Sequence, residues 1–198
     1  MLNTLRPALA RLLTPVGEAL ARTPVTPNML TVAGTVGVSA SALALFPIGE
    51  LFPGAFICTI FVFTDMLDGL LARIKGSSGK FGAFLDSTLD RVADAAIFGG
   101  ITLWFAKNNH PMAAVAIYCL AVGFLVSYSK ARAEGLGLKC ANGLIERPER
   151  MVIGLTSIGL SGLGVPYVLD VGLWALAVLS TVTLAQRIRS VYVSAGNP

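Results

Sequence analysis

Four aspartates in one short segment are the residues of this sequence whose type and spacing suit chemistry. Asp65 and Asp68 stand three positions apart, and Asp86 and Asp90 stand four positions apart. On a helix, both spacings put the two carboxylates of a pair on one face. The intervening segment KGSSGK holds two glycines and two serines, which are typical of a turn. We therefore expect two helices that meet at a turn and bring four carboxylates to one end of a bundle.

Converging carboxylates indicate a hard divalent cation. Ionised acids at close range repel one another, and burying them at a membrane boundary is costly unless a cation compensates their charge. Oxygen ligands favour Mg²⁺, Mn²⁺ or Ca²⁺ over zinc, and Mg²⁺ binds through a few carboxylates together with substrate phosphate. Four acids suffice for two ions that neutralise a pyrophosphate and activate an attacking oxygen. An acid-lined structural helix pair and an ion path are the alternatives.

Composition places these helices in a membrane. Of 198 residues, 55% are hydrophobic and only 13% are charged, which is too little polar surface for a soluble globule. The net charge of +4 does not indicate nucleic acid, because the basic residues lie in short turns between apolar segments. Three isolated cysteines suggest neither a disulfide framework nor a zinc site. The predicted fold class is an all-α integral membrane protein, with residues 1–198 forming a single membrane domain.

Apolar runs predict six transmembrane helices in a catalytic bundle over residues 29–190, since about 20 apolar residues cross the hydrocarbon core. The second run is short, so its helix should continue to Arg73 or Lys75, and the third helix should begin near Gly82. Residues 1–22 carry leucines at helical spacing and predict an N-terminal amphipathic interfacial helix. The apolar runs lie at 29–46, 51–64, 92–106, 111–129, 151–169 and 171–186.

The basic residues also predict the orientation. With the N-terminus inside, nearly all of them fall on one side of the membrane, and only Lys107 falls opposite. The positive-inside rule then puts the acids and both termini on the cytoplasmic side of the cell membrane, in a multi-pass protein. An ion-coupled transporter or a channel would place its acids near mid-membrane rather than at one face, so the clustering argues against both.

The acid-rich segment resembles the signature of the CDP-alcohol phosphatidyltransferase family, D-x2-D-G-x2-A-R-x8-G-x3-D-x3-D. The resemblance implies an enzyme that moves the phosphatidyl group of CDP-diacylglycerol onto a small polar alcohol and releases CMP. It implies that the four aspartates hold two Mg²⁺ ions, with Mn²⁺ as a substitute, and that Asp90 is the general base. It also implies a homodimer. The eight matching positions are Asp65, Asp68, Gly69, Ala72, Arg73, Gly82, Asp86 and Asp90.

The resemblance further implies a CDP-diacylglycerol site beside the acids, because family members use the stretch that matches Asn28 to Thr31. Read alone, that stretch is simply an asparagine cap after Pro27. Small side chains after the first acid pair allow close approach to the backbone, and Arg73 offers a planar group suited to phosphate. The expected CDP-diacylglycerol-binding residues are Asn28, Met29, Leu30, Thr31, Gly69, Ala72, Arg73, Ser78 and Gly79.

Basic residues in the second half suggest an acceptor that carries its own phosphate. Lys130, Arg150 and Arg187 each lie at the edge of an apolar helix and are suited to bind such a group. The segments KARAE and ERPER, with the terminal QR, resemble the actinobacterial phosphatidylinositol phosphate synthases of this family, which implies inositol phosphate as the acceptor. Glycerol 3-phosphate, the acceptor of phosphatidylglycerophosphate synthases, remains the alternative, and an archaeal-type archaetidylinositol phosphate synthase would look similar.

Four other polar residues are expected to be structural. Asp94 extends the Asp86–Asp90 ladder by one turn and is expected to form structural hydrogen bonds. His110 falls in the turn NNHP, far from the acids, where we expect a solvated loop residue. Ser127 and Ser129 are expected to bond their own helix backbone.

Overall fold

The computed structural model describes the backbone of residues 6–77, 79–140 and 143–196, and the side chains of that part except those of residues 6–13, 65 and 66. Throughout this part the chain is helical, with no strand. The elements are α1 (Arg6–Ala21), α2 (Pro27–Leu45), the 3-10 helix η2 (Phe46–Ile48), α3 (Leu51–Ile74), α4 (Lys80–Lys107), α5 (Met112–Gly135), α6 (Arg147–Gly162) and α7 (Val168–Ser194).

The helices that carry the site begin with recognisable caps. Thr26 caps α2, and its Oγ1 accepts a hydrogen bond from the backbone N of Met29 at 3.3 Å, while Pro27 occupies the first turn. α6 begins with a capping box in which the side chains of Glu146 and Glu149 each accept a backbone hydrogen bond. These caps fix where the first turns of α2 and α6 lie, and both turns carry residues of the site.

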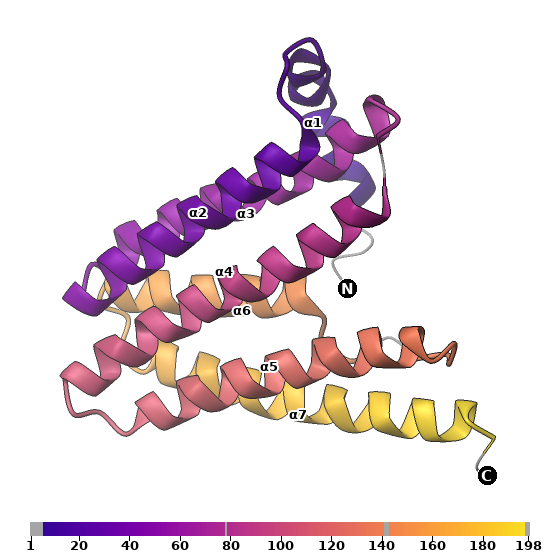
Figure 1. Cartoon of the computed structure of the whole chain (residues 1–198). Helices are drawn as coiled ribbons and strands as arrows, with labels where there is room; N and C mark the ends of the chain where they lie inside the picture. Colours follow the sequence, from indigo (N-terminus) through magenta and orange to yellow (C-terminus); the bar gives the residue numbers. More distant parts are fainter. Residues whose placement is uncertain (1–5, 78, 141–142, 197–198) are drawn as a thin grey trace.

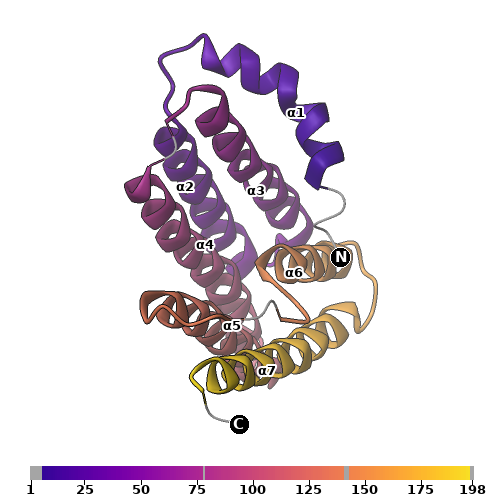
Figure 2. The same ribbon diagram turned by 90° about the vertical axis from the view of Figure 1, so that its right-hand side faces the viewer.

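The long helices form one bundle. α2 packs against α3 and α4, α5 packs against α4 and α7, and α6 packs against α3 and α7 (Figure 1). The starts of α2, α4 and α6 therefore lie at the same end of the bundle as the ends of α3, α5 and α7. Figure 2 shows the same bundle turned by 90°, with α1 running across it.

α1 is held against the acid-bearing helix. A Cβ added to Gly17 would lie 2.8 Å from Leu70 Cδ2 and 3.1 Å from Ile74 Cδ1, so α1 approaches the last turns of α3 closely. Lys75 Nζ donates hydrogen bonds to the carbonyls of Thr23 and Val25, at 2.9 and 2.7 Å. The hinge between α1 and α2 is thus tied to the end of α3.

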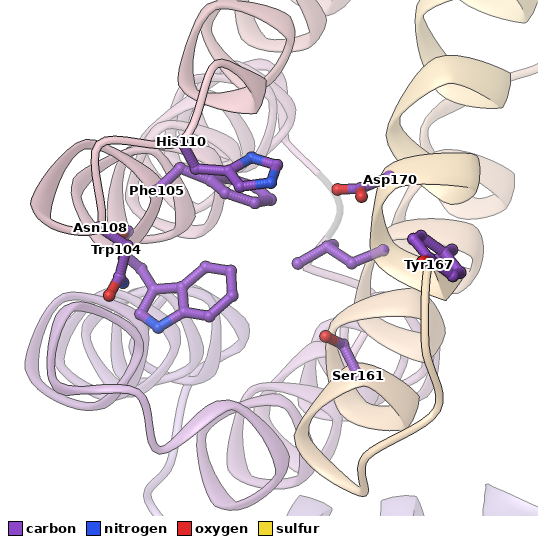
Figure 3. A pocket seen from close by; sticks show the side chains of 8 residues that line it. Trp104, Phe105, Asn108, His110, Ser161, Tyr167 and Asp170 are labelled. Carbon is purple, nitrogen blue, oxygen red and sulfur yellow. Dashed lines mark hydrogen bonds between the residues drawn. The ribbon is translucent and has the colours of Figure 1, made fainter.

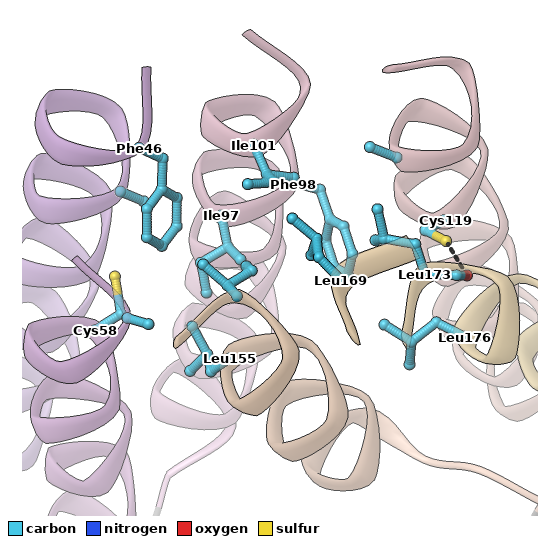
Figure 4. Close-up of a cluster of buried hydrophobic side chains, with 14 of the residues drawn as sticks. Phe46, Cys58, Ile97, Phe98, Ile101, Cys119, Leu155, Leu169, Leu173 and Leu176 are labelled. Carbon is cyan, nitrogen blue, oxygen red and sulfur yellow. Dashed lines mark hydrogen bonds between the residues drawn. The ribbon is translucent and has the colours of Figure 1, made fainter. Parts of the chain in front are cut away.

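The core is apolar and closely packed. Phe46, Ile97, Ile101 and Leu173 are buried in it (Figure 4). Small residues let the helices approach closely, since a Cβ on Gly100 of α4 would lie 2.5 Å from the Ala42 carbonyl oxygen of α2. This close packing holds the acid-bearing ends of the helices in a fixed relation.

Length and composition indicate a membrane-embedded protein. Within the described residues, the helices that are long and apolar enough to cross a membrane are Pro27–Ile48, Leu51–Ile74, Met112–Gly135 and Val168–Ser194. Many large apolar side chains on their outer surfaces are exposed, as lipid contact requires. The extension of the second predicted helix to Ile74 and the early start of the third, at Lys80, are confirmed.

One predicted boundary is wrong. The apolar run at 151–169 was expected to be one helix, but α6 ends at Gly162 and α7 begins at Val168. Gly164 adopts a φ of 87° and Tyr167 a φ of 58°, so this part of the run makes a turn instead of continuing the helix. α6 has 16 residues and is about 24 Å long, and its 147–150 segment lies at the site end.

Candidate active site

Three helices meet at the first acid pair. Asp68 of α3 is buried, and its Oδ2 accepts a hydrogen bond from Thr31 Oγ1 of α2 at 2.5 Å. One turn earlier on α2, Asn28 lies against Gly82 of α4, where an added Cβ would be 3.4 Å from Asn28 Oδ1. A hydrogen bond and a glycine contact thus bring the starts of α2 and α4 to the acidic segment of α3. Asp65 lies one turn before Asp68 in α3, and its side chain is outside the described residues.

The second acid pair lies on α4 and faces arginines. Asp86 and Asp90 are one turn apart and both partly buried. Asp90 Oδ1 lies 2.7 Å from Arg147 Nη1 of α6, and its Oδ2 lies 3.3 Å from Arg91 Nη2. The side chain of Asp90 is only 15% exposed, and both of its oxygens contact arginine nitrogens.

The donors fit a hard divalent cation by their chemistry. Asp68, Asp86 and Asp90 offer oxygen ligands, and an added Cβ on Gly69 would meet nothing within 4 Å, which leaves space beside the acids. Among the side chains that the structure describes, no three acid, histidine or cysteine groups are close enough together to form a metal centre. The centre of four acids therefore stays a prediction, since Asp65 belongs to it.

Of the residues expected to bind CDP-diacylglycerol, those that the structure describes lie in the first turns of α2, the last turns of α3 and the N-cap of α4. Gly69, Arg73 and Gly79 are exposed, and the space where a Cβ on Gly79 would lie is open. Ala72 and Leu30 are half-buried, and Ser78 lies outside the described residues. Next to the acids, an open and largely apolar hollow of about 460 Å³ runs along the surface of α2. It is lined by Asn28, Met29, Val32, Ala33 and Val36.

The predicted acceptor residues meet at one face of α5. Arg187 of α7 is 4% exposed, and its Nη1 donates to the Val126 carbonyl oxygen at 2.5 Å. Arg150 of α6 is 3% exposed and packs against Gly123, where an added Cβ would be 3.6 Å from Arg150 Nε. Lys130 is half-buried on the same face of α5, one turn beyond Val126.

Two of these guanidinium groups keep unused donors. In the part of the chain that the structure describes, Arg150 Nη2 and Arg187 Nε are buried without a hydrogen-bond partner. Buried donors left in this way are costly, and a phosphate would satisfy them. Arg150 and Arg187 thus pack against the same face of α5 with donors available to an anion, and the binding of an acceptor by these residues and Lys130 stays a prediction.

Two residues of the site were missed by sequence reasoning as functional candidates. Arg147 contacts both Asp90 and Asp94, and Asp94 is buried among arginines, with Arg147 Nε donating to its Oδ1 at 3.1 Å. The hydrogen bonding expected of Asp94 is confirmed. A signal existed for Arg147, because it stands in the same ERPER segment as Arg150, but its partners depend on how α4 and α6 cross.

A separate pocket lies at the other end of α4, with a volume of about 140 Å³ (Figure 3). Trp104 and His110 help to line it, and Trp104 stands about 21 Å along α4 from Asp90. None of the predicted site residues is among its walls. His110 is exposed and its Nδ1 accepts a hydrogen bond from the Met112 N at 3.3 Å, as a loop residue does. The chemistry therefore belongs to the acidic end.

Comparison with known proteins identifies the family of this chain. The family model described as CDP-alcohol phosphatidyltransferase matches residues 24–184, which span both acid pairs and the first turns of α2 and α6. The chain belongs to the CDP-alcohol phosphatidyltransferase family. It is accordingly an enzyme, a transferase of phospholipid biosynthesis. Arg187 lies just beyond the matched range.

Relatives within the CDP-alcohol phosphatidyltransferases are similar over nearly the whole chain. A phosphatidylinositol phosphate synthase of Streptomyces avermitilis is 50% identical over 94% of this chain and 80% of its own length. One of Mycobacterium tuberculosis is 44% identical over 96% of this chain and 90% of its own.

Solved structures of the Mycobacterium tuberculosis synthase superpose closely on this chain. A crystal structure with CDP-diacylglycerol bound has a TM-score of 0.88 at 44% identity and covers 94% of this chain and 96% of its own. A second, in complex with manganese and citrate, also has a TM-score of 0.88 and covers 92% of this chain and 90% of its own.

Proposed function

We propose that this enzyme transfers the phosphatidyl group of CDP-diacylglycerol to inositol phosphate, giving phosphatidylinositol phosphate and CMP. The observation that carries the proposal is the meeting of the signature acids with Thr31, Gly82 and Arg147 at one end of the bundle. Relatives at 50% and 44% identity are named phosphatidylinositol phosphate synthases, and a structure of one holds CDP-diacylglycerol.

CDP-diacylglycerol is proposed to bind along α2 with its pyrophosphate toward the acids. The start of α2 directs the positive end of its helix dipole toward an anion, and Arg73 at the end of α3 is exposed and offers a planar group suited to phosphate. The apolar hollow that begins at Asn28 suits an acyl chain, because its walls are mostly methyl and methylene groups. Gly69 leaves room for the nucleotide to approach the α3 backbone.

Asp90 is proposed to be the general base. It takes the proton of the acceptor hydroxyl, whose oxygen then forms a bond to the β-phosphorus of CDP-diacylglycerol. The bond from that phosphorus to the bridging oxygen breaks, and CMP leaves with the electron pair. The hydrogen bond from Arg147 orients the Asp90 carboxylate for this step.

Asp65, Asp68, Asp86 and Asp90 are proposed to hold two divalent ions, with Mg²⁺ as the natural metal. Bound there, such ions neutralise the pyrophosphate and stabilise the charge that builds up on CMP. A relative has been crystallised in complex with manganese and citrate, which supports the use of a divalent metal.

The acceptor phosphate is proposed to lie between Lys130, Arg150 and Arg187. Within the described part of the chain, Arg150 Nη2 and Arg187 Nε have no hydrogen-bond partner, and these two side chains form ion pairs with Asp94 and Glu146. Guanidinium groups bind phosphate through paired hydrogen bonds. Because two arginines have donors available here, we infer that the acceptor carries a phosphate group.

The architecture is proposed to have six crossings in a single domain, with α4 and α6 as the third and fifth. α1 is proposed to lie in the membrane interface, across the end of the bundle. The acids and both termini are proposed to face the cytoplasm, because the basic residues gather at that end. A homodimer is proposed from the family alone.

CMP release by the purified enzyme tests the proposal. CDP-diacylglycerol and Mg²⁺ are supplied with inositol phosphate, free inositol, glycerol 3-phosphate or serine. We expect turnover with inositol phosphate only, its loss with EDTA, and its return with Mg²⁺ or Mn²⁺. Preference for glycerol 3-phosphate would overturn the acceptor, and EDTA-resistant release would overturn the metal centre.

A further inference from the structure

Asp94 is a buried acid that lies next to the site without belonging to the acid signature. It stands on α4 one turn beyond Asp90 and is 3% exposed. Both of its oxygens face arginines: Oδ1 lies 3.1 Å from Arg147 Nε, and Oδ2 lies 3.6 Å from Arg150 Nη2 and 4.0 Å from Arg91 Nε. A buried carboxylate is tolerated only with such compensation, so its charge and these arginines depend on one another.

Arg147 and Arg150 of α6 connect Asp94 to the proposed base and to the proposed acceptor site, respectively. Arg147 continues to Asp90, with its Nη1 2.7 Å from Asp90 Oδ1. Arg150 continues to the α5 face, where Gly123 leaves room for its guanidinium group and where Arg187 also packs. One carboxylate thus contacts the arginine beside the proposed base and an arginine of the proposed acceptor site.

The contacts of Arg150 indicate that Asp94 holds its guanidinium group in place. Its Nη2 is buried without a hydrogen-bond partner, and the ion pair with Asp94 at 3.6 Å is too long for one. Attraction to Asp94 therefore sets the place of the guanidinium group while leaving that donor available. An arginine with a satisfied donor set would bind an incoming phosphate less well.

We propose that Asp94 is a positioning residue for the acceptor: through Arg150 it sets the affinity for the acceptor phosphate, and through Arg147 it aligns Asp90 with the acceptor hydroxyl. The proposal rests on the proposed function, because it takes Asp90 as the base and Arg150 as a ligand of a phosphorylated acceptor. If Asp94 only joined α4 to α6, its replacement would lower stability, but it would not raise the KM for the acceptor more than the KM for CDP-diacylglycerol.

The substitution Asp94→Asn tests this, because it keeps the size of the side chain and removes its charge. We expect the KM for inositol phosphate to rise about tenfold or more, the scale of a charge-assisted contact, and kcat to fall. The KM for CDP-diacylglycerol should stay within about twofold. Calorimetric binding of inositol phosphate without turnover should weaken by the same factor as KM. The matched control is Asp170→Asn, a half-buried acid at the far end of α7.

A double-mutant cycle with Arg150→Gln separates positioning from structure. If Asp94 acts through Arg150, adding Asp94→Asn to Arg150→Gln should raise the acceptor KM by less than about threefold further. Additive effects, an unchanged acceptor KM, or equal losses for both substrates would each overturn the proposal.

A second variant, Asp94→Glu, keeps the proposal testable if Asp94→Asn does not fold. Asp94→Glu keeps the charge and moves it by one methylene group, so it should fold and show an acceptor KM between those of wild type and Arg150→Gln. Wild-type affinity in this variant would overturn the positioning role. If wild type prefers glycerol 3-phosphate, the proposed acceptor fails, yet the same KM comparison with that acceptor still decides the role of Asp94.

Discussion

Arg147 Nη1 of α6 lies 2.7 Å from Asp90 Oδ1 of α4, the shortest of the ion-pair distances given above for these two helices. The contact joins the last acid of the signature to a residue outside it. Because Arg147 also donates to Asp94 through Nε, its guanidinium group is held in one orientation by two carboxylates one turn apart. The carboxylate group of the proposed base is therefore held in one orientation before the acceptor binds.

Replacing Arg147 by lysine should lower kcat about tenfold. Lysine keeps the charge, but its single ammonium group cannot contact Asp90 and Asp94 at the same time through two separate nitrogens, as the guanidinium group does. The KM for CDP-diacylglycerol should remain within about twofold, as measured by CMP release. Arg132→Lys, an exposed arginine on α5, is the control. Equal kcat values for the two variants would contradict an orienting role for Arg147.

Replacing Asp90 by asparagine should reduce turnover by about 10²- to 10⁴-fold, the usual contribution of a positioned base. Asparagine has the same shape and cannot accept the hydroxyl proton. The melting temperature should change little compared with kcat. Retention of full activity in a correctly folded variant would remove Asp90 as the base.

Replacing Thr31 by valine should weaken metal activation. The change keeps the shape of the side chain and deletes the hydrogen bond to Asp68, which is worth about 1–2 kcal/mol and orients one carboxylate oxygen. The Mn²⁺ concentration for half-maximal activity should rise about three- to tenfold. Thr35→Val, one turn further along α2, is the control. An unchanged Mn²⁺ dependence would show that this hydrogen bond does not prepare the acid.

Replacing Gly82 by valine should raise the KM for CDP-diacylglycerol about tenfold. A Cβ already reaches 3.4 Å from Asn28 Oδ1, so the branched side chain must displace Asn28 from the start of α2. Gly99→Val is matched to it, because Gly99 lies in the same helix and an added Cβ there meets nothing within 4 Å. Similar KM values in both variants would mean that Asn28 does not contribute to lipid-nucleotide binding.

The sequence was informative wherever local spacing decides the structure. Acid pairs at three and four residues placed Asp68 and Asp90 on helices that extend beyond the apolar runs, as α3 and α4 do. The end of α6 was missed because apolar residues continue through Val165, whereas the turn depends on backbone conformation at Gly164 and Tyr167. Hydropathy reports lipid contact and does not detect such a turn.

The contacts between helices were the part that spacing could not predict. The position of Arg150 and Arg187 at helix ends suggested a common binding role, but their packing against α5 and the partners of Arg147 depend on how the helices cross. Likewise, Gly82 was recognised by its place in a pattern, while its neighbour Asn28 lies on a helix far away in the sequence. The positions of individual side chains required the folded bundle.

The open hollow lies along α2, whereas the residues proposed to bind the acceptor phosphate, Lys130, Arg150 and Arg187, lie on α5, α6 and α7. One reactant then diffuses in two dimensions within the leaflet, and the other arrives from bulk water. We expect the rate to follow the mole fraction of CDP-diacylglycerol in a micelle or vesicle, so that adding inert detergent slows the enzyme at constant total substrate. The supply of the lipid to this enzyme is set by its density per unit area of membrane, and the supply of the alcohol by its concentration per unit volume.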